Sequence, residues 1–359
     1  MATTVVIGVL VAAFHVVKTA GLVVNLWWFP ALKARDRAPD RPRTSMMVPA
    51  RNEASRLPRL LPGLLAQPAE EILVLDDEST DATADVLTRY RDPRLRVIAG
   101  SARPNGWVGK NWACHQLAQA ATGDLLVFCD ADVILRPGAL DAVWAQMCRQ
   151  QAAVFSVFPR QLAGSLGERL LVPLIDENLL AFLPHRLLDA PVPAAAVANG
   201  QLLAFRRDAY RAVGGHQAVA GHIVEDLALA RRTRRLGRKL GLALGGDLIA
   251  VRMYDGYRSA VEGFGKSLRA AHAGSSALLV ASAAWNLAAY TAPWLLLTQG
   301  AGWPLAAGLG LLQRVLVNVK TGRRAYVEAA LVPVTAPAAL PVYAVALRRT
   351  ARWKGREYR

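Results

Sequence analysis

The fold class of this chain is decided by a continuous apolar run that ends in two carboxylates: Leu125-Leu126-Val127-Phe128-Cys129, followed by Asp130-Ala131-Asp132. An earlier stretch repeats the pattern, because Glu71-Ile72-Leu73-Val74-Leu75 precedes Asp76-Asp77. Such runs are typical of strands buried on both faces of a parallel sheet. Ligands of open sheets bind at the carboxyl ends of the strands, so both acidic pairs are predicted to face one crevice. Carboxylates gathered there need a cation or a polar ligand.

The region between Pro42 and Leu248 alternates apolar strand-like runs with helical stretches. This alternation predicts an α/β fold with a doubly wound, Rossmann-like and mostly parallel sheet. Neither GxGxxG nor GxxxxGK[ST] occurs, which argues against a dinucleotide-binding dehydrogenase and a P-loop nucleotidase. We expect strands at 45–48, 72–75, 95–99, 125–129, 154–158 and 202–205, and helices at 54–65, 80–90, 110–121, 139–149 and 224–236.

The composition indicates contact with an anionic surface. Among 359 residues, Lys and Arg exceed Asp and Glu by 43 to 27, which gives a formal net charge of +16. Hydrophobic residues make up 53% and are concentrated at the two ends, so a membrane is favoured over nucleic acid. No nucleic-acid-binding module is recognisable, and we predict no nucleic-acid partner. The three cysteines have no metal-ligand spacing and are predicted to be reduced.

Apolar segments at both ends predict a multi-pass membrane protein. Val5 to Trp28 is long enough to cross a hydrocarbon core of ~30 Å, and the basic residues after it favour the cytoplasmic side. Ser275–Thr298 and Ala301–Val317 are expected to form a membrane hairpin, and Ala325–Leu347 either crosses or re-enters the bilayer. A buried core helix is the alternative for each. We therefore expect an anchor over 1–30, a cytosolic domain over 42–252, an amphipathic interfacial helix over 253–273, membrane helices over 275–347 and a basic tail over 348–359.

Further polar motifs could complete the site. Val48-Pro49-Ala50-Arg51-Asn52-Glu53 ends the first strand and opens a helix, whose free N–H groups favour polar or anionic ligand atoms. Asp77 could accept a hydrogen bond from a base or ribose hydroxyl. The spacing of Asp130 and Asp132 can place both side chains together, one for the ribose and one for Mg²⁺ or Mn²⁺. Taken singly, each motif also fits an ordinary polar turn.

Two helix starts carry charged groups suited to catalysis. In Gly106-Trp107-Val108-Gly109-Lys110 the glycines allow close approach, and Lys110 could neutralise a leaving diphosphate. Glu225-Asp226 opens a later helix, where a carboxylate could take the proton of an incoming hydroxyl. The alternatives are a surface lysine and a carboxylate that complements the helix dipole.

The order of these motifs resembles the family 2 glycosyltransferases with the GT-A fold. The likeness covers about residues 44–270 and is carried by Val48–Glu53, Asp76–Asp81, Asp130-Ala131-Asp132 and Glu225-Asp226. Within this family the chain is most similar to the membrane-bound bacterial branch that glycosylates carotenoid-type and related lipids. That likeness is carried by Gly106–Ala113, Asn199-Gly200-Gln201, Arg252-Met253-Tyr254 and Trp353–Tyr358.

The resemblance implies an inverting transfer of one sugar from a nucleotide-sugar, a UDP-sugar first of all, to a carotenoid, hopanoid or related lipid at the cytoplasmic face of the bacterial inner membrane. The QxxRW motif of processive synthases is absent. A polyprenyl-phosphate glycosyltransferase and a non-catalytic membrane-tethered binding protein remain alternatives. The implied residues are Asp226 as base with Glu225 beside it; Pro49, Arg51, Asn52, Glu53, Asp76, Asp77, Gly109, Lys110 and Asp130 for the donor; Asp132 and Asp130 for the metal; and Asn199, Gly200, Gln201 and Tyr257 on the acceptor side.

Overall fold

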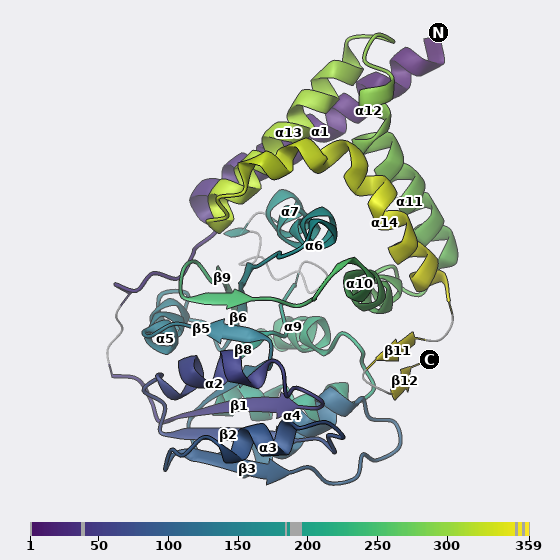
Figure 1. Ribbon diagram of the computed structural model, residues 1–359. Helices are drawn as coiled ribbons and strands as arrows, with labels where there is room; N and C mark the ends of the chain where they lie inside the picture. The colour runs from purple at the N-terminus through teal and green to yellow at the C-terminus, as the bar shows by residue number, and fades with distance from the viewer. Residues whose placement is uncertain are drawn as a thin grey trace. The chain divides into compact units, whose positions relative to one another are not determined.

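The computed structural model describes residues 2–36, 40–183, 185–186, 196–348, 351–353 and 356–358. The chain divides into two compact units. The sheet unit comprises Pro30–Arg160 and Arg186–Val251, and the helical unit comprises Met1–Phe29, Gln161–His185 and Arg252–Arg359. Figure 1 labels their elements.

The sheet unit is built on a seven-stranded sheet with the order β3-β2-β1-β4-β8-β6-β9. Strand β8 runs antiparallel to both of its neighbours, β4 and β6, and the other pairs are parallel. The sheet is therefore mostly parallel, as predicted. Its strands are β1 (Thr44–Ala50), β2 (Glu71–Asp76), β3 (Leu95–Ala99), β4 (Leu125–Cys129), β6 (Val154–Phe158), β8 (Leu202–Arg206) and β9 (Leu240–Leu244).

Short elements complete this unit. Strand β5 (Val133–Leu135) pairs antiparallel with β10 (Ile249–Val251), and β7 (Arg160–Gln161) lies where the chain passes between units. Helix α4 packs against β1 and β2, and α5 packs against β6 and β9. The helices are α2 (Leu57–Leu65), α3 (Thr83–Thr88), α4 (Gly109–Ala120), α5 (Ala139–Arg149), α8 (Arg207–Ala212), the 3-10 helix η3 (His216–Val219) and α9 (Glu225–Arg235).

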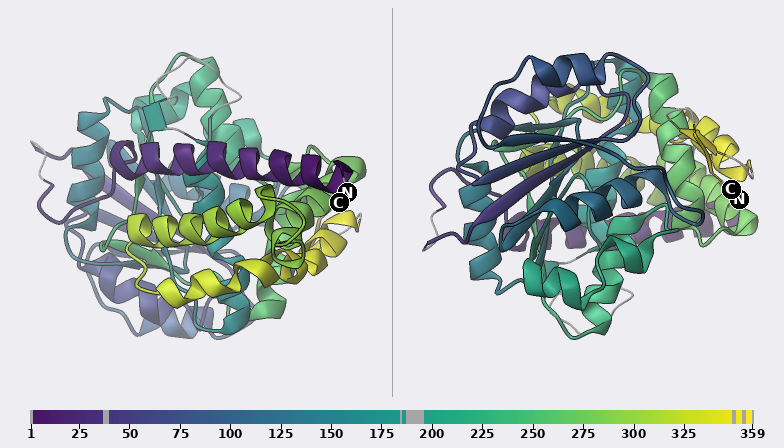
Figure 2. Two further views of the ribbon diagram at one scale, coloured as in Figure 1. Left: turned by 90° about the horizontal axis from the view of Figure 1, so that it is seen from above. Right: turned by 90° about the horizontal axis from the view of Figure 1, so that it is seen from below.

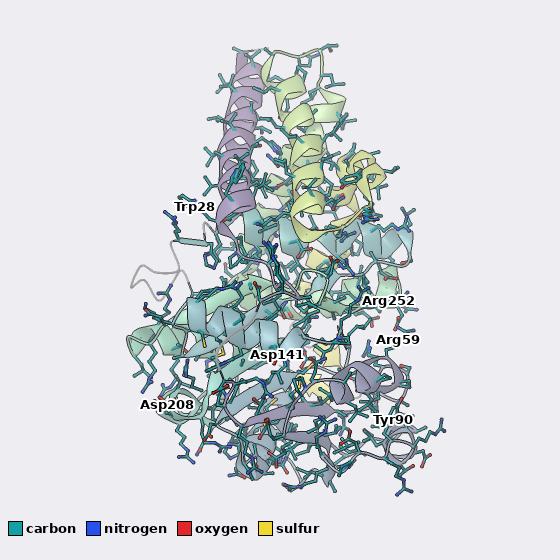
Figure 3. All side chains as sticks on the ribbon, turned by 90° about the vertical axis from the view of Figure 1, so that its left-hand side faces the viewer. Trp28, Arg59, Tyr90, Asp141, Asp208 and Arg252 are labelled. Carbon is teal, nitrogen blue, oxygen red and sulfur yellow. The ribbon has the colours of Figure 1, made fainter. Side chains whose placement is uncertain are left out.

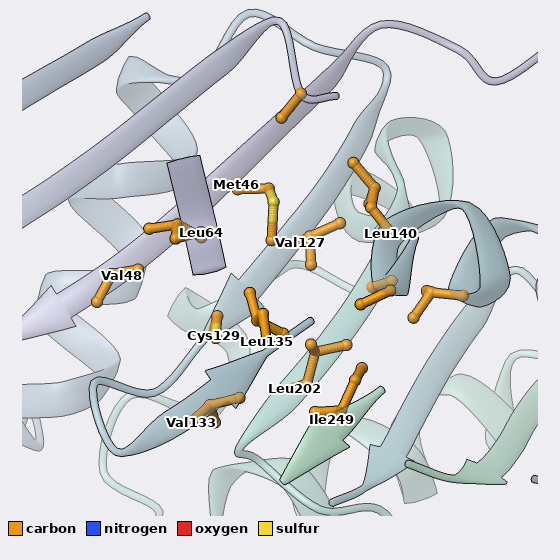
Figure 4. Packing of buried hydrophobic residues seen from close by; sticks show 14 of the residues in the cluster. Met46, Val48, Leu64, Val127, Cys129, Val133, Leu135, Leu140, Leu202 and Ile249 are labelled. Atoms are coloured by element: carbon orange, nitrogen blue, oxygen red, sulfur yellow. The ribbon is translucent and has the colours of Figure 1, made fainter. Parts of the chain in front are cut away.

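The core of the sheet unit explains why the apolar runs are continuous. Every residue of β4 and β6 is buried, so both faces of these strands are covered. In Figure 4, Met46, Val127 and Leu202 of the neighbouring strands β1, β4 and β8 pack toward Leu135 of β5 and Ile249 of β10. Burying an aliphatic side chain of this size contributes about 1.5–3 kcal/mol, so these strands hold the rest of the unit in place.

The helical unit packs long helices side by side. Helix α1 runs along α13, and α10 packs against α14, as the left view of Figure 2 shows for the first pair. The unit consists of α1 (Ala2–Trp28), α6 (Leu166–Leu171), α7 (Pro173–Phe182), α10 (Tyr257–Ala271), α11 (Ser276–Tyr290), α12 (Ala292–Leu295), α13 (Gly302–Thr321), the 3-10 helix η4 (Tyr326–Leu331), α14 (Val332–Leu347), and the antiparallel pair β11 (Ala351–Trp353) and β12 (Arg356–Tyr358).

Among the described residues, two helices are long and apolar enough to cross a membrane, Ala2–Trp28 and Tyr326–Leu347, and they indicate membrane association. The expected hairpin takes a different form. Its first arm ends at Tyr290 and resumes only as the four-residue α12, because Pro293, three residues after Tyr290, has no N–H to continue the helix. Its second arm, α13, extends to Thr321 and buries Arg314. Of the expected tail over 348–359, residues 349–350, 354–355 and 359 lie outside the described residues.

Polar side chains join α1 to the rest of the helical unit. Glu177 of α7 forms an ion pair with Lys18 of α1, and its Oε2 lies 3.2 Å from Nη2 of Arg314. All three side chains are at most 4% exposed. At the C-terminal end of α1, Trp28 points outward in Figure 3, which is the arrangement of an interfacial aromatic residue. Lys18, a charged residue within this apolar helix, therefore serves packing inside the helical unit.

Candidate active site

The candidate site lies in the sheet unit, at the carboxyl end of β4. Because β8 is antiparallel to β4, the turn before β8 lies beside the residues that follow β4. The backbone N–H of Asp130 donates to the carbonyl of Gln201 at 2.9 Å. The predicted Asp-x-Asp motif and the Asn199-Gly200-Gln201 turn are thus neighbours. Asn199 stabilises this turn by accepting from the Gln201 N–H at 2.8 Å.

A single ammonium group connects the acidic motifs. Nζ of Lys110 lies 2.8 Å from Oδ1 of Asp130 and 2.8 Å from Oε1 of Glu225. It also donates to the carbonyl of Gly200 at 3.3 Å. Burial by itself would lower the pKa of Lys110, but Asp130 and Glu225 outweigh burial and raise that pKa well above its ordinary value. Lys110 is therefore a permanent cation that joins two predicted motifs.

Asp226 differs from its neighbour Glu225. Its Oδ2 accepts from the Gly200 N–H at 2.7 Å, and its Oδ1 accepts from the Leu227 N–H at 2.7 Å. Burial, followed by the charge of Glu225, raises the pKa of Asp226 to about 7. Burial also acts on Glu225, but Lys110 overrides it and the pKa of Glu225 is lowered. The pair thus separates into a fixed carboxylate and a group that exchanges a proton near neutral pH, which suits acid–base catalysis.

Gly200 lies where three charged groups come closest to the backbone. A Cβ at this position would lie 3.0 Å from Oε1 of Glu225, 3.1 Å from Nζ of Lys110 and 3.3 Å from Oδ2 of Asp226. Its backbone also bonds two of these groups, as donor to Asp226 and as acceptor from Lys110. Glycine is needed here for close approach of the backbone.

Asp132 has the properties of a metal ligand. Its Oδ1 is buried and has no hydrogen-bond partner among the described residues. Burial, and then the charge of Asp130, raises the pKa of Asp132 to about 7, against the opposing charge of Arg56. An orphaned carboxylate oxygen beside a second carboxylate fits a divalent cation. In the described part of the chain no three His, Cys, Asp or Glu residues form a cage by themselves, and Mg²⁺ is commonly held by one or two carboxylates plus substrate phosphates.

The predicted donor-binding residues at the ends of β1 and β2 bond mainly the loop that follows β2. Arg51 donates to the carbonyls of Asp77 and Glu78, and Oδ1 of Asn52 accepts from the Thr80 N–H at 2.8 Å. Oδ1 of Asp76 accepts from the Ser79 N–H at 3.0 Å. Pro49 lies within β1, opposite Leu75 of β2. These contacts fix the two strand exits against each other, and a direct donor contact from Arg51, Asn52 or Asp76 stays a prediction.

Asp77 and Glu53 lie at the same two strand exits, and their contact with the donor stays a prediction. Asp77 is 4% exposed, and its N–H donates to the carbonyl of Ala50 at 2.8 Å, so it is held at the junction of both strands. Oε2 of Glu53 accepts from Nη1 of Arg56 at 3.1 Å. Arg56 was not predicted from the sequence. Its position one helical turn after the Arg51-Asn52-Glu53 motif was the available signal.

Asn111 is a second residue that the sequence analysis missed. Its Nδ2 donates to the carbonyls of Val219 at 2.9 Å, Ala220 at 3.0 Å and His222 at 2.9 Å. The Val108 N–H also donates to Ala220, at 2.8 Å. The segment that carries Lys110 therefore anchors the loop that leads into Glu225 and Asp226. Gly109, predicted for the donor, is the buried first residue of α4 and starts this helix.

Tyr257, predicted on the acceptor side, belongs to the helical unit. It is the first residue of α10, and its hydroxyl donates to the carbonyl of Ala338 in α14 at 2.7 Å. This bond connects two helices of the same unit. A contact with the acceptor stays a prediction.

The sheet topology and the acidic strand exit define a GT-A type of fold. Over 96% of this chain and 99% of the other, the structure resembles that of the mannosyltransferase PcManGT from Pyrobaculum calidifontis in complex with GDP-Man and Mn²⁺, with a TM-score of 0.54. The sequences are 18% identical, so this likeness concerns the fold alone.

Residues 45–214 match the family model of glycosyl transferase family 2. The chain is 30% identical over 233 residues to the 4,4'-diaponeurosporenoate glycosyltransferase of Staphylococcus haemolyticus (strain JCSC1435), which is 62% of this chain and 60% of that protein. It is 28% identical over 260 residues to the protein of that name from Staphylococcus aureus (strain MRSA252), which is 70% of this chain and 67% of that protein. The chain thus spans about three fifths of the length of the first relative. Residues 45–214 thus match a family 2 glycosyltransferase domain, and the chain is similar to proteins named as carotenoid glycosyltransferases, in agreement with the family that the motif order predicted.

Proposed function

We propose that this protein transfers one sugar from a nucleotide-sugar to a membrane lipid, with inversion at the anomeric carbon. The observation that carries this proposal is the convergence of Asp130, Lys110, Glu225 and Asp226 around Gly200 within a family 2 domain. A carboxylate with a pKa near 7, next to a carboxylate that an ammonium group keeps ionised, supplies a proton acceptor.

In this proposal Asp132 and Asp130 hold Mg²⁺ or Mn²⁺, consistent with the orphaned oxygen of Asp132. When bound, the metal stabilises the negative charge of the departing nucleoside diphosphate. Lys110 keeps Glu225 ionised and holds Asp130 in place. Asp226 takes the acceptor proton, while the acceptor oxygen bonds the anomeric carbon and the bond from that carbon to the diphosphate oxygen breaks. Asp77 is assigned to the nucleotide.

A membrane lipid is the proposed acceptor for two reasons. Ala2–Trp28 and Tyr326–Leu347 have the length and composition of membrane spans. The curated relatives carry the name of a carotenoid glycosyltransferase, so a carotenoid, hopanoid or related isoprenoid lipid is proposed here. We place the sheet unit on the cytoplasmic side of a bacterial inner membrane, where nucleotide-sugars are available. A UDP-sugar is the proposed donor, and GDP-mannose is the alternative to test first.

The proposal is tested with the full chain in lipid nanodiscs, supplied with Mn²⁺, a bacterial lipid extract and either labelled UDP-glucose or labelled GDP-mannose. We expect label in the lipid fraction, and loss of both transfer and donor cleavage in Asp132→Ala. The matched control is Asp208→Ala, because Asp208 is an exposed carboxylate of the same unit, paired with Arg238. Absence of metal-dependent donor cleavage with either donor would support the non-catalytic alternative. Label in an acid-labile polyprenyl phosphate would support that acceptor class instead.

A further inference from the structure

The ammonium group of Lys110, beside the proposed base Asp226, has all of its hydrogen-bond donors engaged. An ammonium group has three N–H donors. Those of Lys110 have three acceptors within reach, on Asp130, Glu225 and the Gly200 carbonyl. His216 is a second basic group near Glu225, but burial lowers its pKa to about 3, so it is neutral at pH 7. An anionic acceptor that approached Asp226 would therefore meet no uncommitted positive charge from either group.

The groups around Asp226 are arranged to accept a hydrogen bond. Each oxygen of Asp226 already takes one backbone N–H, from Gly200 and Leu227, and a carboxylate oxygen has a second lone pair available. Glu225 next to it stays ionised through Lys110. An alcohol can donate its O–H to Asp226, whereas a carboxylate has no proton to donate and adds a like charge.

We propose that the acceptor group is the neutral hydroxyl of a lipid alcohol, and that this site discriminates against a lipid carboxylate. This inference rests on the proposed function and names its acceptor class. The alcohol proposed here differs from the carboxylic acid after which the two relatives are named. In the step, the alcohol oxygen bonds the anomeric carbon, its proton passes to Asp226, and the electron pair of the broken bond leaves with the diphosphate. The product is a glycoside rather than a glycosyl ester.

The test compares two probes that differ only in the reacting group, geranylgeraniol and geranylgeranoic acid, with the full chain in nanodiscs, Mn²⁺ and a labelled nucleotide-sugar. Products are treated with mild alkali, which cleaves a glycosyl ester and leaves a glycoside intact. We expect an alkali-stable product from the alcohol, formed at least about tenfold faster than any ester. Asp226→Asn should lower glycoside formation by about a hundredfold or more, the size of a general-base contribution.

The outcomes separate the inference from the proposed function. Preferential formation of the alkali-labile ester, or equal use of both probes, would overturn the inference while leaving a metal-dependent glycosyltransferase. Metal-dependent donor cleavage without transfer to either probe would overturn the inference and the proposed transfer to a lipid together. Absence of metal-dependent donor cleavage would overturn the proposed function as well. A loss in Asp226→Asn that is equally large for both probes would contradict the assignment of Asp226 as the base for an alcohol. Circular dichroism and the thermal unfolding midpoint show that this variant is folded.

Discussion

Replacing Gly200 by alanine tests the geometry of the site most directly. The added Cβ would lie 3.0–3.3 Å from Glu225, Lys110 and Asp226, and ordinary contacts begin at about 3.4 Å. Each charged end must therefore retreat by a few tenths of an ångström, and the 2.7 Å bond to Asp226 must shift with it. Since a misplacement of about 1 Å can cost about a hundredfold in rate, we expect kcat to fall by roughly ten- to a hundredfold.

The assay measures steady-state sugar transfer by the full chain, alongside thermal unfolding. Gly200 does not have a positive φ, so alanine introduces no backbone strain and the fold should be retained. Gly308→Ala is the matched control, because a Cβ on this helical glycine meets nothing within 4 Å. It should leave turnover unchanged and can stabilise α13 slightly.

Two results would refute this reasoning. If kcat of Gly200→Ala stays within about threefold of the parent, the three charged groups do not act as one positioned set. If both alanine variants lose activity together, the effect is not local to the site. A fall confined to Gly200→Ala, with an unchanged unfolding midpoint, supports the geometry.

Asp226 must be a carboxylate to accept a proton, and its pKa is about 7. We therefore expect kcat to fall about tenfold per pH unit below pH 7 and to level off above it. A flat profile from pH 5 to 8 would exclude this role. Glu177→Gln removes the carboxylate that the buried cations Lys18 and Arg314 share, and it should lower the free energy of unfolding in mixed micelles by about 3–5 kcal/mol. The exposed Glu262→Gln should cost about 0.5 kcal/mol or less, and equal losses would contradict the buried network. Asn111→Ala should lower kcat at least about tenfold with little change in donor KM, because the loop before Glu225 loses its anchor; a change confined to KM would argue against positioning. EDTA should abolish donor cleavage and added Mn²⁺ should restore it, so activity that persists in EDTA would exclude a required metal.

The strands could be predicted because burial on both faces requires continuous apolar runs. The runs at 72–75 and 125–129 coincide with β2 and β4 to within one residue at each end. Helix starts were less accurate: the helix expected from residue 54 begins at Leu57, because the preceding motif bonds the loop after β2 instead of continuing the helix. The membrane hairpin stays a prediction, and hydropathy did not indicate that α13 buries Arg314 against Glu177 of α7.

The sequence by itself indicated the family and the acidic groups of the site, because an acidic motif directly after an apolar strand is visible as a local pattern. It could not determine which groups meet. The antiparallel placement of β8 brings Gly200 beside Asp130, and only that fold lets Lys110 reach Asp130 and Glu225 together. The tertiary structure also decides the protonation states of the two neighbouring carboxyl groups. Burial and the nearest charge, rather than residue type, make Glu225 a fixed carboxylate and Asp226 a group that titrates near neutral pH.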